Sequence, residues 1–280
     1  MDRISEIVQG IPKAPPHTIT EQPTYDINSK EYTERECNVY NSLDGKLTGY
    51  DCTICKNRGC SYEPRFNEIS NSWAPVAIEC RCMSIRAEIA RRQQSGLSKL
   101  MKKYTFQNYK ADEQWQLNIA KGACDYVRKP EGWFFIGGQP GSGKTHICTA
   151  IVNSLLKKGY SARYMVWTDE ITAIKQAATD ADKYGGIIRG LQKSEVLYID
   201  DFFKKPKGYT VTGADIDNTF KIINYRYNEE LPTIISSELS LAQIIEIDEA
   251  LGSRIAEMSK GSDYFVEKDS TKNHRYRSHA

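Results

Sequence analysis

The sequence has no long apolar run and almost no excess of charge. Nowhere in its 280 residues is there a stretch of about 18 apolar residues that could span a bilayer. The first thirty residues contain no apolar core of signal-peptide length. The formal net charge is only +2, so whole-chain charge does not indicate a nucleic-acid partner, and any such partner must be recognised by local patches. We expect a cytoplasmic protein that does not enter membranes.

Cysteine is scarce through most of the chain and concentrated in one part of it. The chain has 8 cysteines, and after residue 82 only Cys124 and Cys148 remain. In a reducing cytosol such cysteines rarely form structural disulfides. The asymmetry predicts a metal site in front of a cysteine-poor domain.

Two close cysteine pairs, C-x-x-C and C-x-C, supply four soft ligands for a tetrahedral zinc ion. The first pair has the common zinc-knuckle spacing, whereas the second is tighter and less common. Cys60 could replace one member and Cys37 looks spare. Scattered free thiols and an iron–sulfur cluster are the alternatives. The predicted Zn²⁺ ligands are Cys52, Cys55, Cys80 and Cys82.

Composition divides the chain into four segments. A polar, proline-containing lead is followed by the cysteine-rich segment, which is too short to bury much core and would owe its fold to zinc. A basic stretch then reads as a helix, a break at Gly96 and a second short helix. The expected segments are 1–35 (lead), 36–84 (zinc-binding docking domain), 85–103 (basic connector) and 104–280 (nucleotide-binding domain).

After residue 104, short apolar runs alternate with helical patterns. "GWFFIGG", "ARYMVW", "VLYID" and "PTIISS" read as strands, and amphipathic segments such as "THICTAIVNSLLKKG" and "GADIDNTFKIINYRYNEE" read as helices. This alternation predicts an α/β fold with a parallel, three-layer sheet.

The segment "GQPGSGKT" fits the phosphate-loop pattern G-x-x-x-x-G-K-[ST] between a predicted strand and a predicted helix. Its glycines let backbone N–H groups point at phosphate oxygens, and the following helix presents its positive dipole end. A chance match is the alternative. Lys144 would hold the outer phosphates, and the Thr145 hydroxyl would hold Mg²⁺. The predicted nucleotide-binding residues are Gly138, Gln139, Pro140, Gly141, Ser142, Gly143, Lys144, Thr145 and His146.

The apolar strand "VLYIDD" ends in two acids. Asp200 would hold Mg²⁺ at the carboxyl edge of the sheet, and Asp201 would polarise an attacking water. The alternative is an ordinary strand that ends in two solvated acids. Adjacent acids argue against a kinase or small GTPase and favour a hydrolysing ATPase with an extra strand between the two motifs. We assign that extra strand to "ARYMVW".

Two later motifs could extend the site. "PTIISSELS" offers Ser237 and Glu238 as sensors of the γ-phosphate, or else a loop without a catalytic role. "LGSRIAEM" places Arg254 on a helix, from which it could reach a neighbouring subunit's phosphate as an arginine finger. A lone surface arginine is the alternative.

Nucleic-acid contact is indicated by two basic stretches. The connector and "FFKKPKGY" could meet phosphates, and Phe202, Phe203 and Tyr209 could stack on bases. A solvated charged face is the alternative. The basic residues of the connector are Arg86, Arg91, Arg92, Lys99, Lys102 and Lys103.

Taken together, these motifs resemble the DnaC/IstB-like AAA+ ATPases, which include bacterial and phage helicase loaders and transposition helpers. The resemblance covers about residues 100–280 and rests on "GQPGSGKTH", "VLYIDD", "INYRYNEELPTIISSELS", "LGSRIAEM" and "KNHRYR". The third of these is most similar to phage and Gram-positive loaders. The cysteine-rich segment resembles the amino-terminal domain of DnaI-type loaders, which binds zinc and contacts the replicative helicase.

The resemblance implies an ASCE-type P-loop ATPase that uses ATP, Mg²⁺ and Zn²⁺. It implies ATP-controlled delivery of a hexameric replicative helicase onto single-stranded DNA, with self-assembly that depends on ATP or on the helicase. It also implies nucleotide and Mg²⁺ binding by Lys144 and Thr145, metal binding by Asp200, water activation by Asp201, a finger at Arg254 and a second sensor at Arg275, with Arg277 close behind.

Two residues depart from the family pattern. Asp201 stands where many relatives have Glu, and Glu238 stands where many have Asn. An acid that faces a γ-phosphate would be repelled unless it is paired or turned away. The departures predict slow hydrolysis. They leave open two alternatives to a loader: an IstB-like transposition helper, and a nucleotide-bound adaptor with little hydrolysis.

Overall fold

The computed structural model describes residues 26–274. The chain divides into two compact units, Met1–Ile89 and Ala90–Ala280, and the boundary falls inside helix α3 (Cys82–Gln94). Within the described residues, no helix is long and apolar enough to cross a bilayer. The finer division into four segments stays a prediction.

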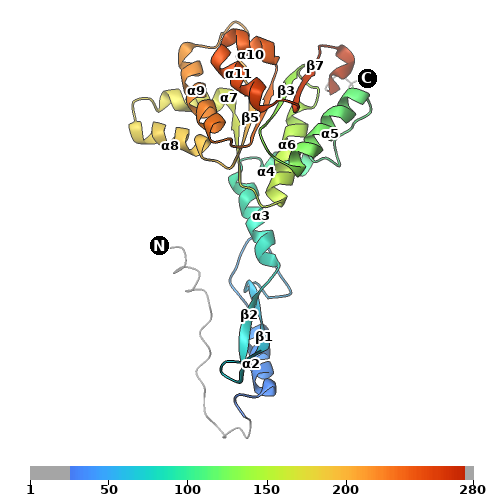
Figure 1. Ribbon diagram of the computed structural model, residues 1–280, viewed down its shortest axis with the longest axis vertical. Coiled ribbons are helices and arrows are strands. Elements are labelled where there is room, and N and C mark those ends of the chain that lie inside the picture. Colours follow the sequence, from blue (N-terminus) through green and yellow to red (C-terminus); the bar gives the residue numbers. More distant parts are fainter. Residues whose placement is uncertain (1–25, 275–280) are drawn as a thin grey trace. The chain divides into compact units, whose positions relative to one another are not determined.

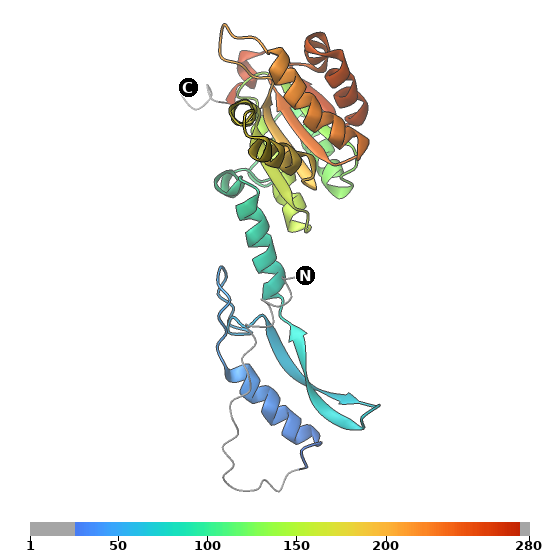
Figure 2. The same cartoon turned by 90° about the vertical axis from the view of Figure 1, so that its left-hand side faces the viewer.

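The first unit is a helix packed on a β-hairpin. Helix α2 (Lys30–Ser42) lies against the antiparallel strands β1 (Cys60–Asn67) and β2 (Ser72–Glu79), as Figure 2 shows in blue and cyan. The Asn41 amide joins them, because it donates to the Tyr62 carbonyl (2.8 Å) and accepts from the Tyr62 N–H (2.9 Å). The hairpin alternates too weakly between apolar and polar residues to have been predicted from the sequence.

The second unit is built on a five-stranded parallel sheet (Figure 1). Its central strands are buried on both faces, which is typical of a parallel sheet covered by helices. The strands, in their order across the sheet, are β4 (Ala162–Val166), β5 (Val196–Phe202), β6 (Thr233–Ser237), β3 (Trp133–Gly138) and β7 (Asp263–Val266).

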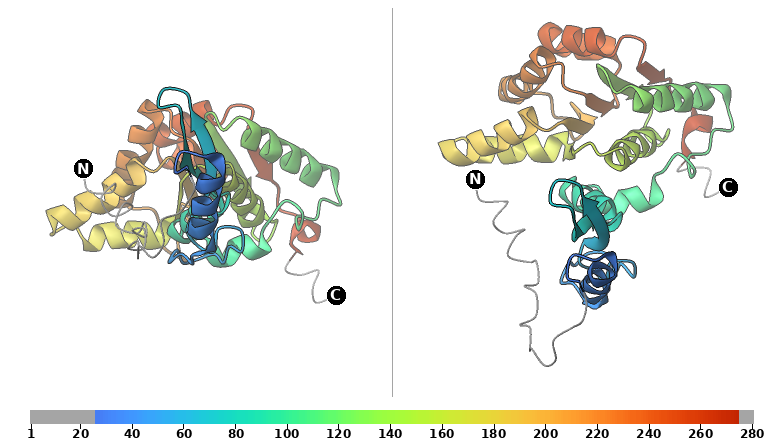
Figure 3. Two further views of the ribbon diagram at one scale, coloured as in Figure 1. Left: turned by 90° about the horizontal axis from the view of Figure 1, so that it is seen from below. Right: turned by 60° about the horizontal axis from the view of Figure 1, so that its bottom comes forward.

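Helices cover both faces of this sheet (Figure 3). A separate cluster of buried apolar side chains lies under each set of helices. The predicted three-layer α/β fold is confirmed. On one face lie α4 (Ser98–Lys103), α5 (Gln114–Arg128) and α6 (Lys144–Lys157). On the other lie α7 (Trp167–Gln176), α8 (Ala181–Gln192), α9 (Gly213–Asn228), α10 (Leu241–Ile247) and α11 (Glu249–Met258).

The strand "ARYMV" lies between the two motifs in the chain, as expected, but not between the two motif strands in the sheet. β6 separates β3 from β5, whereas β4, the "ARYMV" strand, lies at the edge of the sheet beyond β5. The burial of the strands agrees with this order, because β6 is buried throughout and β4 only in part. Chain order does not determine spatial order when every connection is a helical crossover.

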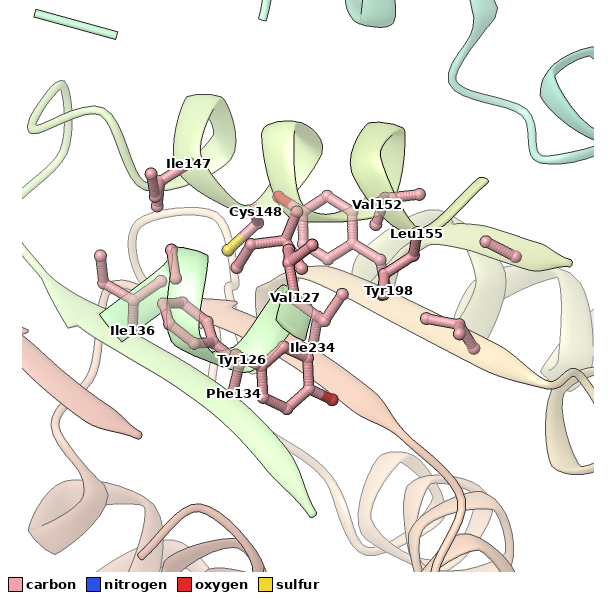
Figure 4. Close-up of a cluster of buried hydrophobic side chains, with 14 of the residues drawn as sticks. Tyr126, Val127, Phe134, Ile136, Ile147, Cys148, Val152, Leu155, Tyr198 and Ile234 are labelled. Carbon is pink, nitrogen blue, oxygen red and sulfur yellow. The ribbon is translucent and has the colours of Figure 1, made fainter. Parts of the chain in front are cut away.

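Helix α6 follows directly from the phosphate loop and fixes it to the core. Its inward face, predicted from the spacing of Ile147, Ile151 and Leu155, is fully buried. Figure 4 shows α6 side chains packed over the sheet, next to residues of α5. The labelled residues there are Tyr126, Val127, Phe134, Ile136, Ile147, Cys148, Val152, Leu155, Tyr198 and Ile234.

Helix α8 is not predicted from the sequence, because three glycines interrupt its helical pattern. The structure supports both of its ends. The Asp180 side chain caps the first turn by accepting from the Lys183 N–H (3.0 Å). At the other end, the buried guanidinium of Arg226 donates to the carbonyls of Leu191, Gln192, Ser194 and Pro232 and to the Thr233 hydroxyl.

Candidate functional site

The phosphate loop connects β3 to α6 through glycines that no other residue could replace. Gly138 has φ 110° and Gly141 has φ 78°, both in the left-handed region. A Cβ atom on Gly138 would lie 2.1 Å from the Val266 carbonyl oxygen, and one on Gly141 would lie 2.1 Å from Asn273 Oδ1. The backbone can therefore turn tightly enough to direct its N–H groups at an anion.

Lys144 begins α6, and its side chain is folded into the loop. Its Nζ donates to the carbonyls of Gly138 and Gln139, each at 2.7 Å. The residue is only 7% exposed, and this burial lowers the pKa of its ammonium group to about 8. A polyphosphate in the loop would offer this amine a stronger acceptor than two neutral carbonyls.

Thr145 and Asp200 meet at the carboxyl end of the sheet, as the two motifs predicted. The Thr145 hydroxyl donates to Asp200 Oδ1 (3.3 Å), and the Tyr164 hydroxyl donates to Oδ2 (3.1 Å). The Ser236 hydroxyl also donates to Asp200 Oδ1. A buried carboxylate bonded to the hydroxyl that follows Lys144 fits the oxygen ligands of Mg²⁺, which keeps its remaining positions for phosphate and water.

Asp201 and Glu238 share one cation. Lys204 Nζ lies 3.1 Å from Asp201 Oδ2 and 2.9 Å from Glu238 Oε1. The acid at position 238 is therefore paired, which is one of the two conditions under which it could stand near a phosphate. The sequence alone did not identify Lys204, because nothing in "FFKKPKGY" distinguishes this lysine from its neighbours.

Of the two adjacent serines in β6, the structure brings Ser236 to the site and not Ser237. The Ser237 hydroxyl donates to the Phe202 carbonyl (2.7 Å) and accepts from the Leu239 N–H (3.0 Å). Successive side chains of a strand point to opposite faces, so only one of the pair can face Asp200. These contacts do not support Ser237 as a γ-phosphate sensor.

A cavity of about 540 Å³ opens over the phosphate loop. One wall is the segment between α4 and α5, where the sequence offered Phe106 and Tyr109 either as a border of the adenine or as core residues; Tyr109 lines the cavity, and both residues pack against the core. His146 is held there, stacked on Tyr104 with its ring centroid 4.8 Å away and bonded to the Thr105 carbonyl (2.9 Å). Besides the loop residues, the lining includes Lys103, Tyr104, Asn108, Tyr109, Lys110 and His274.

The segment after β7 returns to the phosphate loop. The His274 N–H donates to the Gly141 carbonyl (3.0 Å), and the Gln139 amide donates to the Asp269 carbonyl (2.7 Å). The second sensor was assigned to Arg275 with Arg277 as the alternative, and both lie outside the described residues. His274, the last described residue, lines the cavity.

Arg254 lies away from its own subunit's cavity. Its Nε donates to Asn224 Oδ1 (3.1 Å), and its guanidinium lies over the rings of Phe220 (5.1 Å) and Tyr227 (5.3 Å). These partners are all on α9. An arginine finger acts on a neighbouring subunit, so the contacts do not test that role, and it stays a prediction.

In the first unit, the structure brings together the four cysteines assigned to zinc. The sulfurs of Cys52, Cys55, Cys80 and Cys82 all lie within 4.8 Å of one another, and all four residues are buried. Two of the Sγ–Sγ distances are 3.8 Å and 3.5 Å. Tetrahedral zinc with bonds of about 2.3 Å places its sulfurs about 3.8 Å apart, so the donor set fits this metal.

The loop between the pairs also suits a thiolate site. The Gly59 N–H donates to Cys55 Sγ (3.3 Å), and the backbone at Lys56, Asn57 and Gly59 has positive φ. Cys37 and Cys60 do not belong to the group of four. Cys60 therefore has no ligand position in this arrangement.

The aromatic residues proposed to stack on bases are mostly buried. Phe202 and Phe203 are 0% and 3% exposed and stack on each other, so the structure contradicts a base-stacking role for them. Tyr209 is 73% exposed and remains able to stack. In the basic connector, Arg91 donates to the Leu156 carbonyl at the end of α6, so it stabilises a helix end.

Comparison with known proteins places this geometry in a family. The family described as IstB-like ATP binding protein matches residues 79–257. The phage-like element PBSX protein XkdC of Bacillus subtilis (strain 168) is 31% identical over 228 residues, which cover 78% of this chain and 82% of the relative. The Bacillus subtilis protein YqaM is 33% identical over 199 residues, and the match spans 67% of this chain but only 62% of that relative.

More distant relatives carry names from DNA replication. The replicative helicase loader DnaC of Escherichia coli (strain K12) is 25% identical over 204 residues, 69% of this chain and 77% of the relative. A crystal structure of DnaI has a TM-score of 0.50 and 21% identity, covering 60% of this chain and 93% of that one, which shows a shared fold. The chain belongs to the family of IstB-like ATP binding proteins.

Proposed function

We propose that this protein is an Mg²⁺-dependent ATPase that loads a replicative DNA helicase onto single-stranded DNA. The observation that carries the first part is the meeting of Thr145 with Asp200 beside the phosphate loop and Lys144. Bound Mg²⁺ would neutralise phosphate charge there, and Lys144 would exchange its two loop carbonyls for phosphate oxygens. In this proposal, Asp201 accepts a proton from an attacking water.

The loader role is supported by the named relatives and by the division of the chain. DnaC is described as a replicative helicase loader and is similar over most of this chain. A cysteine-centred unit separate from the nucleotide-binding unit is what a partner-specific docking module requires. In this proposal, Cys52, Cys55, Cys80 and Cys82 hold Zn²⁺ and stabilise the surface that contacts the helicase, while ATP times its release.

Native mass spectrometry of the protein mixed with the replicative helicase of its source cell tests the proposal. We expect a complex of defined stoichiometry that carries one zinc per loader chain and depends on ATP. Lys144→Ala is the matched variant, because it keeps the first unit intact while weakening nucleotide binding. If no complex forms in either nucleotide state, the loader role is refuted for that client.

Two other functions are favoured by specific observations. The match to IstB-like proteins favours a transposition helper, which would bind a transposase and DNA instead of a helicase. The pairing of Asp201 with Lys204 favours an adaptor that binds nucleotide with little hydrolysis, because the carboxylate is occupied. A steady-state ATPase assay with Asp201→Asn separates the adaptor from the ATPase, since only the ATPase loses turnover.

A further inference from the structure

Lys204 is held between two acids at the edge of the nucleotide cavity. Lys204, Asp201 and Glu238 all line that cavity, and their side chains are 43%, 36% and 34% exposed. Burial alone would lower the pKa of Lys204, but hydrogen bonds to Glu238 and Asp201 raise it above its ordinary value. The amine therefore stays charged, and its present partners are the two groups that would otherwise repel a phosphate.

The backbone that carries Lys204 is fixed, whereas its side chain is free to change partners. The Thr168 hydroxyl of α7 donates to the Lys204 carbonyl (2.9 Å), and the neighbouring Lys205 pairs with the buried Asp215 of α9 (2.7 Å). Directly before these anchors, Phe203 has φ 59°, in the left-handed region that residues other than glycine rarely adopt. Such backbone persists only where the surroundings hold it, and it is common at functional sites.

The charges around the cavity require a cation near the outermost phosphate. Lys144 lies at the phosphate loop, where its amine donates to a loop carbonyl. Asp200 accepts from Thr145 at the proposed Mg²⁺ position. Asp201 and Glu238 also line the cavity, with Lys204 as their shared partner. A γ-phosphate carries more negative charge than either carboxylate and would attract the lysine more strongly, whereas a nucleoside diphosphate lacks this group.

We propose that Lys204 senses the γ-phosphate: it leaves Asp201 and Glu238 when a nucleoside triphosphate binds and contacts the terminal phosphate instead. This inference rests on the ATPase activity proposed above. Glu238 is then a positioning residue, which holds the lysine in the absence of a triphosphate. The Lys204–Glu238 ion pair takes the place of the neutral Asn that many relatives have at position 238.

The exchange also releases Asp201 for catalysis. While Asp201 Oδ2 is paired with Lys204, that oxygen is not available to accept a proton. Once it is free, an attacking water gives its proton to Asp201 and its oxygen bonds to the γ-phosphorus. The bond from the γ-phosphorus to the β-phosphate oxygen breaks, and its electron pair stays on ADP, with inorganic phosphate as the second product.

Equilibrium binding of ADP and of a β,γ-methylene analogue of ATP, each with Mg²⁺, tests the inference on the full chain. For Lys204→Ala we expect about tenfold weaker binding of the triphosphate analogue and an ADP affinity within about twofold, because one charge-assisted contact is lost. Lys204→Arg should keep most of the affinity for the triphosphate analogue. Lys207→Ala, an exposed lysine of the same loop, is the control and should change neither affinity.

Glu238→Gln supplies an independent readout. Removing its charge frees Lys204, so the preference for triphosphate over diphosphate should increase several-fold, which a merely structural role for Glu238 would not produce. Equal loss of both affinities in Lys204→Ala, or no change in either, overturns the sensor role while leaving the ATPase proposal intact. If the unsubstituted protein binds neither nucleotide, both proposals are refuted.

Discussion

The two units of this protein keep their folds by different means. The first unit has a small apolar content, and the cluster at its centre is made of four cysteines with Met83 packed against them. The second unit has two apolar layers, one on each face of a parallel sheet. A small domain that cannot bury enough apolar surface needs a metal or a cross-link, whereas a larger α/β domain does not. The comparison predicts that the units respond differently to the same perturbations.

Removal of the proposed zinc ion should have the largest effect, and only on the first unit. Structural zinc sites contribute on the order of 10 kcal/mol to folding, which exceeds the whole stability of a small domain. We expect Cys55→Ser, or a strong chelator, to unfold this unit while nucleotide binding by the second unit persists. Limited proteolysis with mass spectrometry measures this. Cys60→Ser is the matched control, and equal loss of structure in it would contradict the ligand assignment.

Loss of Arg226 should destabilise the second unit by about 3 kcal/mol or more. Arg226→Met leaves several buried carbonyl groups without a donor at the end of α8, each at a cost of about 1–3 kcal/mol. Chemical denaturation measures the change in the free energy of unfolding. Arg189 is an exposed arginine of α8, and Arg189→Met should change the free energy of unfolding by no more than about 0.5 kcal/mol. A similar effect of both substitutions would contradict this account.

Nucleotide affinity should fall as the pH rises through the pKa of Lys144. The pKa is lowered to about 8 by burial, and bound phosphate favours the charged amine, so binding takes up a proton near that pH. We expect affinity to weaken between pH 7 and about pH 9, and calorimetry in buffers of different ionisation enthalpy should detect the proton. Lys144→Arg should remove the pH dependence. Proton release on binding would refute the prediction.

The smallest effect expected is an acid sensitivity of the second unit. Burial alone would raise the pKa of Asp215, but hydrogen bonds from Lys175, Lys205 and Thr212 hold it well below its usual range. A carboxyl with a depressed pKa contributes stability above the unfolded value of about 4, and this contribution is lost as the pH falls below it. Asp215→Asn should therefore flatten the dependence of unfolding free energy on pH between about 5 and 3. An unchanged slope would contradict the role of this ion pair.

Much of the nucleotide site could be predicted because its chemistry is local in the chain. The phosphate loop, its flanking strand and helix, and the acidic strand end each occupy a few consecutive residues, and the structure joins Thr145 to Asp200. The cysteine pairs were equally readable, because close thiols at knuckle spacing have few other uses in a reducing environment.

What sequence reasoning missed depends on contacts between distant segments. Helix α8 is interrupted by glycines and depends on Arg226 of α9, a residue far along the chain. In the sheet, "TIISS" lies between the two motif strands and "ARYMV" lies at the edge. This order follows from the crossover connections, which the sequence of neither strand indicates. Phe202 and Phe203 looked like a stacking platform until their burial against Trp167 was visible.

The sequence by itself determined the fold class, the phosphate loop, the acid that meets Thr145 and the four clustered thiols, because each is encoded by neighbouring residues. Only the tertiary structure decided which serine of β6 faces Asp200, that His274 returns to the phosphate loop, and that Lys204 joins Asp201 to Glu238. The physical reason is the same in each case. These contacts join segments that are far apart in the chain, and their positions follow from how helices and strands pack.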